Sequence, residues 1–149
     1  MIAIVAVIAS CSRNAGDAPP PPTPPEAVVV FDRPAPRTLT PDQVEALLDL
    51  AYDQAGAPGL TSSGVDVRTR AREVIETESG RRVDALEQKP DSVDVALADG
   101  GAPSAGRGLG MLIPATFLRH HRPSTSMNIY DPVANVAALM AYLGSNEGQ

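Results

Sequence analysis

The chain has 149 residues, of which 43% are hydrophobic, and this is enough for one modest domain with its own core. Its net charge is −6 and its isoelectric point lies near 4.8, which argues against the basic surface of a nucleic-acid-binding domain. Aromatic residues make up 3% and tryptophan is absent, so the core must consist mainly of Val, Leu, Ile, Ala and Met. The single cysteine, Cys11, excludes a disulfide within the chain.

The chain starts with an apolar run, "MIAIVAVIASC", which is too short to span a bilayer and suits the apolar region of a signal peptide. The end of this run, "IASC", resembles the bacterial lipoprotein box, in which an aliphatic residue and two small residues precede a cysteine. In such proteins that cysteine, here Cys11, carries the lipid and becomes the first residue of the mature protein. The resemblance implies an extracytoplasmic envelope protein, anchored to the membrane by lipid. The alternatives are a plain secretory signal and a buried strand with an incidental cysteine.

Proline dominates the next segment, residues 12–37, and eight of the 15 prolines lie between Pro19 and Pro36. Because proline fixes φ and removes a hydrogen-bond donor, this segment is not expected to form helices or sheets. We expect a disordered, semi-extended tether that advances about 3 Å per residue where its backbone is polyproline II. Its apolar stretch "AVVVF", residues 27–31, is a candidate for packing on the domain, which is expected to occupy residues 38–149.

The domain begins with a strong helix signal. Thr40 is a suitable N-cap, Pro41 takes the first helical position, and Gln43 follows three residues after the cap. The helix is predicted to end at Gly56. The apolar residues that recur at helical spacing along it are Val44, Leu47, Leu48, Ala51 and Ala55.

A second helix is predicted from about Asp66 to Ser79, and Gly80 is suited to end it. Glu78 lies four residues after Val74, so its carboxylate is predicted to share the core-facing stripe and to lie half-buried. The alternative, non-functional interpretation of such a glutamate is a side chain that forms a salt bridge or reaches solvent. The apolar residues of the stripe are Val67, Ala71, Val74 and Ile75.

The rest of the domain combines a long loop with two further helices. The segment from Arg81 to Arg107 is polar, lacks lasting periodicity and is predicted to be a functional or disordered loop. A short helix is predicted from Pro114 to about His120, and a last helix after the N-cap Asp131. We therefore expect a mainly α domain with long loops and little or no sheet. The apolar face of the last helix consists of Val133, Val136, Ala137, Met140 and Leu143, and Gly144 closes it.

Three segments of the chain carry a resemblance to a known family. They are "ESG" at residues 78–80, "GRGLGMLIPATF" at residues 106–117 and "NIYDPVANVAALMAYL" at residues 128–143. In this order and spacing they resemble the motifs of the lysozyme-like lytic transglycosylases, which cleave the glycan strands of peptidoglycan. The resemblance covers about residues 67–143 and implies a small lysozyme-like helical fold.

The resemblance also implies roles for particular residues. Glu78 would be the single catalytic acid and base, and Ser79 would steady it or the substrate. The segment from Gly108 to Met111 would line the sugar cleft, and residues of the last motif would support the cleft wall. The residues implied in substrate binding are Ser79, Gly108, Leu109, Met111, Tyr130 and Asn135.

Glycoside cleavage sets a physical requirement on this acid. A glutamate protonates the leaving oxygen near neutral pH only if its pKa is raised to about 6–7, which burial against apolar groups achieves. The predicted position of Glu78 beside Val74 provides such burial. In this family one carboxylate suffices, because the acetamido group of the substrate stabilises the cationic centre and the C6 hydroxyl closes a 1,6-anhydro ring. A second carboxylate would instead make the protein a hydrolytic lysozyme, and the candidates in the long loop are Asp84, Asp91, Asp94 and Asp99.

The sequence thus predicts a peptidoglycan lytic transglycosylase that cleaves the MurNAc–GlcNAc bond and leaves 1,6-anhydromuramic ends. Its expected partners are glycan strands and, through Cys11, a membrane; we expect a monomer without nucleic acid, cofactor or metal. His120 and His121 are adjacent, so they face different directions and lack a third ligand at metal spacing. The alternative is a non-catalytic peptidoglycan-binding lipoprotein that keeps the fold. It is favoured by Met111, which replaces the glutamine of the family, and by the lack of the later "AYNAG" motif.

Overall fold

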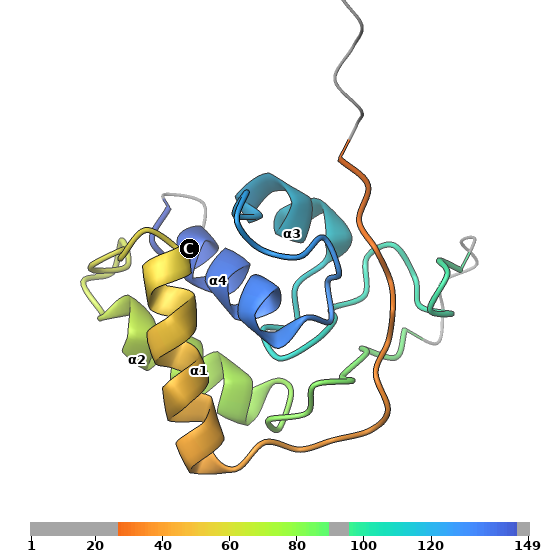
Figure 1. The fold of residues 1–149 in the computed structure, drawn as a ribbon, viewed down its shortest axis with the longest axis horizontal. Helices are drawn as coiled ribbons and strands as arrows, with labels where there is room; N and C mark the ends of the chain where they lie inside the picture. The colour runs from red at the N-terminus through yellow and green to blue at the C-terminus, as the bar shows by residue number, and fades with distance from the viewer. Residues whose placement is uncertain (1–26, 90–95, 146–149) are drawn as a thin grey trace, which may run out of the picture.

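The computed structural model describes residues 27–89 and 96–145, and within these ranges the chain is mainly helical (Figure 1). The described residues form isolated β-bridges but no strand, so the prediction of a mainly α domain with long loops is confirmed. None of the helices in this part of the chain has the length and apolar character needed to cross a membrane. Cys11 and the segment that resembles a lipoprotein box lie outside the described residues. The helices are α1 (Pro41–Gln54), α2 (Val67–Thr77), α3 (Pro114–His120) and α4 (Pro132–Leu143).

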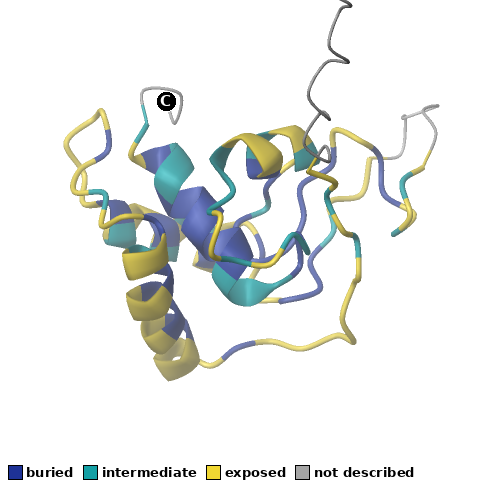
Figure 2. Ribbon diagram, turned by 45° about the horizontal axis from the view of Figure 1, so that its top comes forward, coloured by how far each residue is buried: buried dark blue, intermediate teal, exposed yellow. Residues whose placement is uncertain are grey.

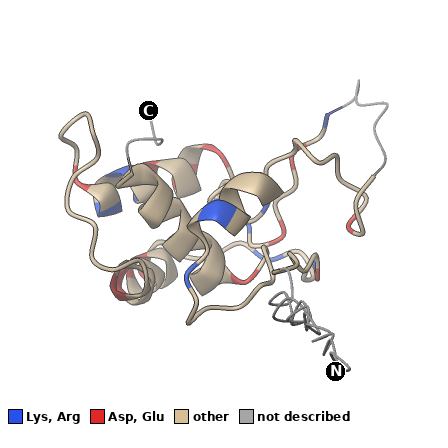
Figure 3. Cartoon of the chain, turned by 90° about the horizontal axis from the view of Figure 1, so that it is seen from above, with Lys and Arg blue, Asp and Glu red and all other residues tan. Residues whose placement is uncertain are grey.

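Helix α4 is the centre of the domain and contacts each of the other three helices. Its sequence contains no charged residue, and α4 is therefore tan in Figure 3. We predicted one apolar face, but residues 134–140 are all buried, and Figure 2 shows the helix as mostly dark blue. The reason is that α1, α2 and α3 contact α4 from different sides, so its surface is covered almost all round.

The helix starts follow the local sequence signals. In α1 the Thr40 hydroxyl accepts a hydrogen bond from the Gln43 N–H, and the Gln43 side chain accepts one from the Thr40 N–H. Asp66 and Asp131 cap α2 and α4 in the same way, each accepting from the N–H three residues later. Helix α2 ends slightly earlier than predicted, and Gly80 then adopts a φ of +58° in the turn that follows.

Residues 27–39, which we call the strap, lie extended along the domain and lead into α1. Val30 pairs with the chain at Asn128, and Thr38 pairs with Arg82. Phe31 packs against the core, as its place in the apolar stretch "AVVVF" suggested. Residues 27–37 are thus held on the domain by hydrogen bonds and apolar contacts, so the prediction of a disordered tether is wrong for this part of it, and residues 12–26 lie outside the described residues.

Asp84 fixes the middle of the strap. Its carboxylate is 2% exposed and accepts a 2.7 Å hydrogen bond from the guanidinium of Arg82. Arg33 of the strap donates from Nε to the Asp84 carbonyl oxygen at 2.8 Å. The hydrogen bond from Arg82 holds the pKa of the Asp84 carboxyl below its usual value. Asp84 is therefore an ionised structural group that connects the strap to the long loop.

A buried ion pair fixes the end of the long loop. Arg107 is the largest fully buried side chain described, and its Nε lies 2.6 Å from Asp99 Oδ2. Its Nη2 donates to Asp99 Oδ1 at 3.1 Å, and its Nη1 donates to the carbonyl oxygens of Ala102 and Ala105. Because these bonds use both carboxylate oxygens and all three guanidinium nitrogens, the buried charges are compensated.

Tyr130 and Phe31 complete this cluster from two other parts of the chain. The Tyr130 hydroxyl donates to Asp99 Oδ2 at 2.6 Å, and the Phe31 ring lies 5.1 Å from the Arg107 guanidinium carbon. Burial alone would raise the pKa of Asp99, but hydrogen bonds, first from Arg107 and then from Tyr130, outweigh burial and lower it to about 2. Burial and the Asp99 carboxylate raise the pKa of Tyr130. The cluster thus connects the strap, the long loop and the start of α4.

Replacing Arg107 with methionine is expected to lower the free energy of unfolding by about 3–5 kcal/mol, because Asp99 is left as an unpaired buried charge. Urea denaturation measures this loss. The matched control is Arg72→Met, since the Arg72–Glu45 pair is partly exposed and such pairs contribute less than about 1 kcal/mol. Similar small losses in both variants would contradict a compensated buried pair at Arg107.

The Asp99 carboxyl also predicts a pH dependence of stability. Its pKa is about 2 in the folded chain against an ordinary value of 3.8, so its contribution is present above pH 4 and is lost as the pH falls toward 2. The advantage of the wild type over Asp99→Asn should therefore shrink by about 2 kcal/mol between pH 5 and pH 2. Urea denaturation at a series of pH values measures it, and a constant difference would refute the assignment.

Candidate functional site

A groove of about 420 Å³ lies between one side of α2, the segment that leads into α3 and the last turns of α4. Each of the three segments that carry the family resemblance contributes to its walls. Arg70 and Glu78 are its two charged lining residues among those the structure describes. The complete lining is Arg70, Val74, Glu78, Gly110, Met111, Leu112, Ile113, Thr116, Leu139, Tyr142 and Leu143.

Glu78 lies in this groove, but the prediction that it is half-buried is wrong. It caps the C-terminus of α2 and is exposed, whereas Val74 is only partly buried and Ile75 is fully buried. The reason is the rotation of the helix: the buried stripe follows Ile75 and, four residues later, reaches Ser79. Glu78 lies one residue off this stripe, at the edge of the groove.

Of the two roles that the resemblance implied for Ser79, the structure is compatible with support of Glu78 and not with contact to a substrate in the groove. Ser79 is 6% exposed, and its hydroxyl donates a 2.9 Å hydrogen bond to the carbonyl oxygen of Ile75. It therefore occupies the interior and does not line the groove. By binding a carbonyl group at the end of α2, Ser79 fixes the backbone that carries Glu78.

A tight turn from Arg107 to Leu112 forms the wall opposite α2. The two residues at its ends exchange backbone hydrogen bonds of 3.0 and 3.1 Å, and Gly108 has a φ of +66°. Met111 has a φ of +48°, a left-handed conformation that is uncommon for a residue with a side chain. This conformation belongs to the turn that brings Met111 into the groove, where the family motif has glutamine.

Asn135 of α4 holds this turn from behind. Its fully buried Oδ1 accepts a 2.6 Å hydrogen bond from the Gly110 N–H, and its Nδ2 donates to the carbonyl oxygens of Arg107 and Ile129. A Cβ atom on Gly108 would lie 2.8 Å from Asn135 Nδ2, and one on Gly110 would lie 3.0 Å from Oδ1. Glycine is needed at position 108, where φ is positive and a Cβ would clash with the amide, and a Cβ at position 110 would be in tight contact with it.

The structure therefore divides the predicted site residues into two groups. Glu78 and Met111 line the groove, together with Gly110 between the predicted positions. Gly108 and Leu109 were expected to line it, but they are buried behind it, because the turn directs them toward α4. The residues that stand in the interior as supports are Ser79, Gly108, Leu109, Tyr130 and Asn135.

Sequence reasoning missed three polar residues of the groove that belong to helices, namely Arg70 of α2, Thr116 of α3 and Tyr142 of α4. Arg70 precedes Glu78 by eight residues, a spacing that places both on one side of α2. Tyr142 lies in the last motif, and its ring makes an edge contact with His120 at 5.4 Å between centroids. Helical spacing from Glu78 was the signal that could have identified Arg70.

Two of the loop carboxylates proposed as a second acid are committed elsewhere. Asp84 and Asp99 are bound to arginines and do not line the groove, while Asp91 and Asp94 lie outside the described residues. Glu78 is thus the one carboxylate among the described residues that lines the groove. No group of three His, Cys, Asp or Glu side chains in the described ranges could hold a metal ion.

A second hollow, of about 550 Å³, lies between the strap and the body of the domain. Asp32, Arg37 and Asp131 are its charged lining residues, and prolines form much of its wall. It is larger than the groove but does not contain Glu78. We take the groove as the candidate site because the acid and the three motif segments meet there.

Comparisons of the chain with known protein families, with curated proteins and with solved structures find no match. The chemistry of the groove must therefore be judged from its residues. It combines one exposed carboxylate, one guanidinium, a tyrosine ring and a wall of apolar side chains. Such a surface can contact both the flat apolar faces and the hydroxyl groups of sugars.

Replacing Asn135 with leucine is expected to lower the free energy of unfolding by about 3 kcal/mol or more, because the buried Gly110 N–H and the Ile129 carbonyl lose their partner and the Arg107 carbonyl loses one of its two hydrogen bonds. Thermal or urea unfolding measures the loss. Asn128→Ala is the control: that amide is only partly buried, and a loss of about 1 kcal/mol is expected. Equal losses would show that the amide of Asn135 does not hold the turn.

Proposed function

We propose that the groove binds a glycan strand of peptidoglycan and that Glu78 cleaves it as a lytic transglycosylase with a lysozyme-like fold. One observation carries the proposal: the three segments that resemble the family motifs meet around a single groove. The first contributes Glu78, the second contributes the turn at Gly110 and Met111, and the third contributes Tyr142. Segments that are far apart in sequence thus form one surface around the expected acid.

In the proposed reaction Glu78 first donates its proton to the glycosidic oxygen, and the bond between this oxygen and C1 of MurNAc breaks. The acetamido group of the same sugar stabilises the positive charge at C1. The Glu78 carboxylate then takes the proton of the C6 hydroxyl, whose oxygen bonds to C1 and closes the 1,6-anhydro ring. The acid is regenerated and no water is consumed, so one carboxylate in the groove is sufficient.

Because Glu78 is exposed, the proposed reaction requires the bound substrate to shield its carboxylate from water. A bound sugar chain would cover the groove and remove water from the acid, as proton transfer to a poor leaving group requires. The same exposure, together with Met111 at the glutamine position, favours the second candidate, a wall-binding module without turnover. For either function, lipid on Cys11 and the proline-rich segment would hold the domain near a membrane and within reach of the wall.

Digestion of purified peptidoglycan by the wild type is expected to release 1,6-anhydromuropeptides, identified by mass spectrometry. Glu78→Gln should lower this release at least about 100-fold, since the amide can neither donate nor accept the proton. Glu76→Gln is the matched control, because Glu76 lies on the same helix, pairs with Arg81 and does not line the groove. It should retain activity.

Other results would change the assignment. Reducing-end products from the wild type would identify a hydrolytic lysozyme. Binding to peptidoglycan sacculi without any product would identify the non-catalytic module. Equal activity of the wild type and Glu78→Gln would contradict the role of Glu78.

A further inference from the structure

Resting on the proposed function, we propose that the guanidinium of Arg70 binds a carboxylate of the glycan substrate, so that the groove selects an anionic strand. Arg70 and Glu78 lie on the same side of α2 with Val74 between them, and all three line the groove. Eight residues of α-helix separate the two charged residues by about 12 Å along the axis. A strand bound at Glu78 would therefore extend to Arg70.

The composition of the rest of the groove indicates that the positive charge of Arg70 serves to bind an anionic group. Apart from Glu78, the other described lining residues are uncharged, and the helix and turn walls are mostly apolar. A neutral sugar polymer has no group that requires a guanidinium. A carboxylate does, and arginine is the side chain whose flat fork of donors matches the two oxygens of a carboxylate.

The ion pair that Arg70 forms with Glu73 is weak enough for a carboxylate of a ligand to compete with it. Arg70 Nη1 lies 2.9 Å from Glu73 Oε2, three residues along α2, and both side chains are about half exposed. Such an exposed pair contributes at most about 1 kcal/mol, so a carboxylate of the ligand can replace or share it. Glu73 itself does not line the groove.

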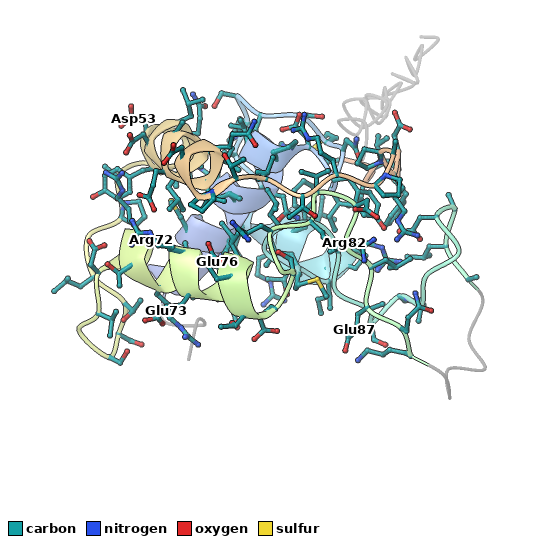
Figure 4. All side chains as sticks on the ribbon, turned by 90° about the horizontal axis from the view of Figure 1, so that it is seen from below. Asp53, Arg72, Glu73, Glu76, Arg82 and Glu87 are labelled. Carbon is teal, nitrogen blue, oxygen red and sulfur yellow. The ribbon has the colours of Figure 1, made fainter. Side chains whose placement is uncertain are left out.

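The other two arginines of α2 serve a different purpose. Arg68 and Arg72 form ion pairs with Asp49 and Glu45 of α1. Figure 4 shows Arg72 on the side of α2 that faces α1, and Glu73 on the opposite side. Two arginines thus hold α2 against α1, whereas Arg70 is the one that lies on the groove.

Peptidoglycan offers carboxylates from two sources. In strands stripped of peptides, each muramic acid carries a free lactyl carboxylate. In intact strands this lactyl group is amide-linked, and the carboxylates belong to the stem peptide. The shared chemistry is an anionic oxygen pair beside the sugar chain, and the choice of glycan distinguishes the two sources.

The test measures equilibrium binding in a Glu78→Gln background, so that cleavage does not consume the probe. The probes are neutral chitooligosaccharides, glycan strands stripped of peptides, and strands with intact stems. Adding Arg70→Gln is expected to weaken binding of an anionic strand about tenfold or more, and to leave the neutral probe unchanged. Adding Arg72→Gln, the matched control, should change neither, and urea unfolding verifies that both variants are folded.

The three probes distinguish the source of the carboxylate, and they distinguish failure of the Arg70 proposal from failure of the proposed function. A loss with stripped strands identifies the lactyl carboxylate, and a loss only with intact strands identifies the stem peptide. No loss, or an equal loss on all three probes, overturns the role of Arg70 while the proposed function stands. Absence of binding of every probe before Arg70 is changed overturns the proposed function and the role of Arg70 with it.

Discussion

A single buried amide holds the wall of the candidate site in place. Asn135 lies near the start of α4, among apolar neighbours, and its two polar atoms bind three backbone groups in the interior. Two of these groups belong to the turn that carries Met111. Because the amide accepts and donates at the same time, no apolar residue can replace it, and Gly108, where a Cβ would clash with the amide, is needed for the same contact. The shape of the groove thus depends on α4, which is also the centre of the core.

The Arg107–Asp99 pair connects this turn to the end of the long loop and to the strap. Arg107 takes part in the turn through its backbone and in the buried ion pair through its side chain. Tyr130, just before α4, and Phe31, in the strap, complete its surroundings. The described parts of the long loop, residues 81–89 and 96–107, and the strap have no regular secondary structure, and charge pairing and burial hold them on the domain. The loop would be expected to move freely without such contacts.

The sequence predicted what local interactions decide and failed where distant contacts decide. The starts of α1, α2 and α4 follow from Thr40, Asp66 and Asp131, whose side chains cap the N–H three residues later. The burial of Glu78 was predicted wrongly because Val74 and Ile75 are both apolar, and the pattern alone does not show which of them faces the core. A rotation of one residue moved the buried position from Glu78 to Ser79.

The partner of Arg107 could not be predicted at all. The long loop contains several aspartates, and local sequence does not indicate which one reaches the interior. A lone arginine between glycines, within an otherwise uncharged stretch, was the signal that a buried charge required a distant partner. Arg70, in contrast, could have been distinguished from Arg68 and Arg72 by its helical spacing from Glu78, and the ion pairs of the other two arginines with α1 agree with that division.

We propose that the groove beside Glu78, and not the hollow under the strap, holds the glycan. NMR titration of Glu78→Gln with a short peptidoglycan oligosaccharide tests it most directly. The amide signals of Gly110, Met111 and Thr116 are expected to shift with one common affinity, because these residues line the groove. Shifts confined to the strap around Asp32 and Arg37, or no shifts at all, would contradict the claim.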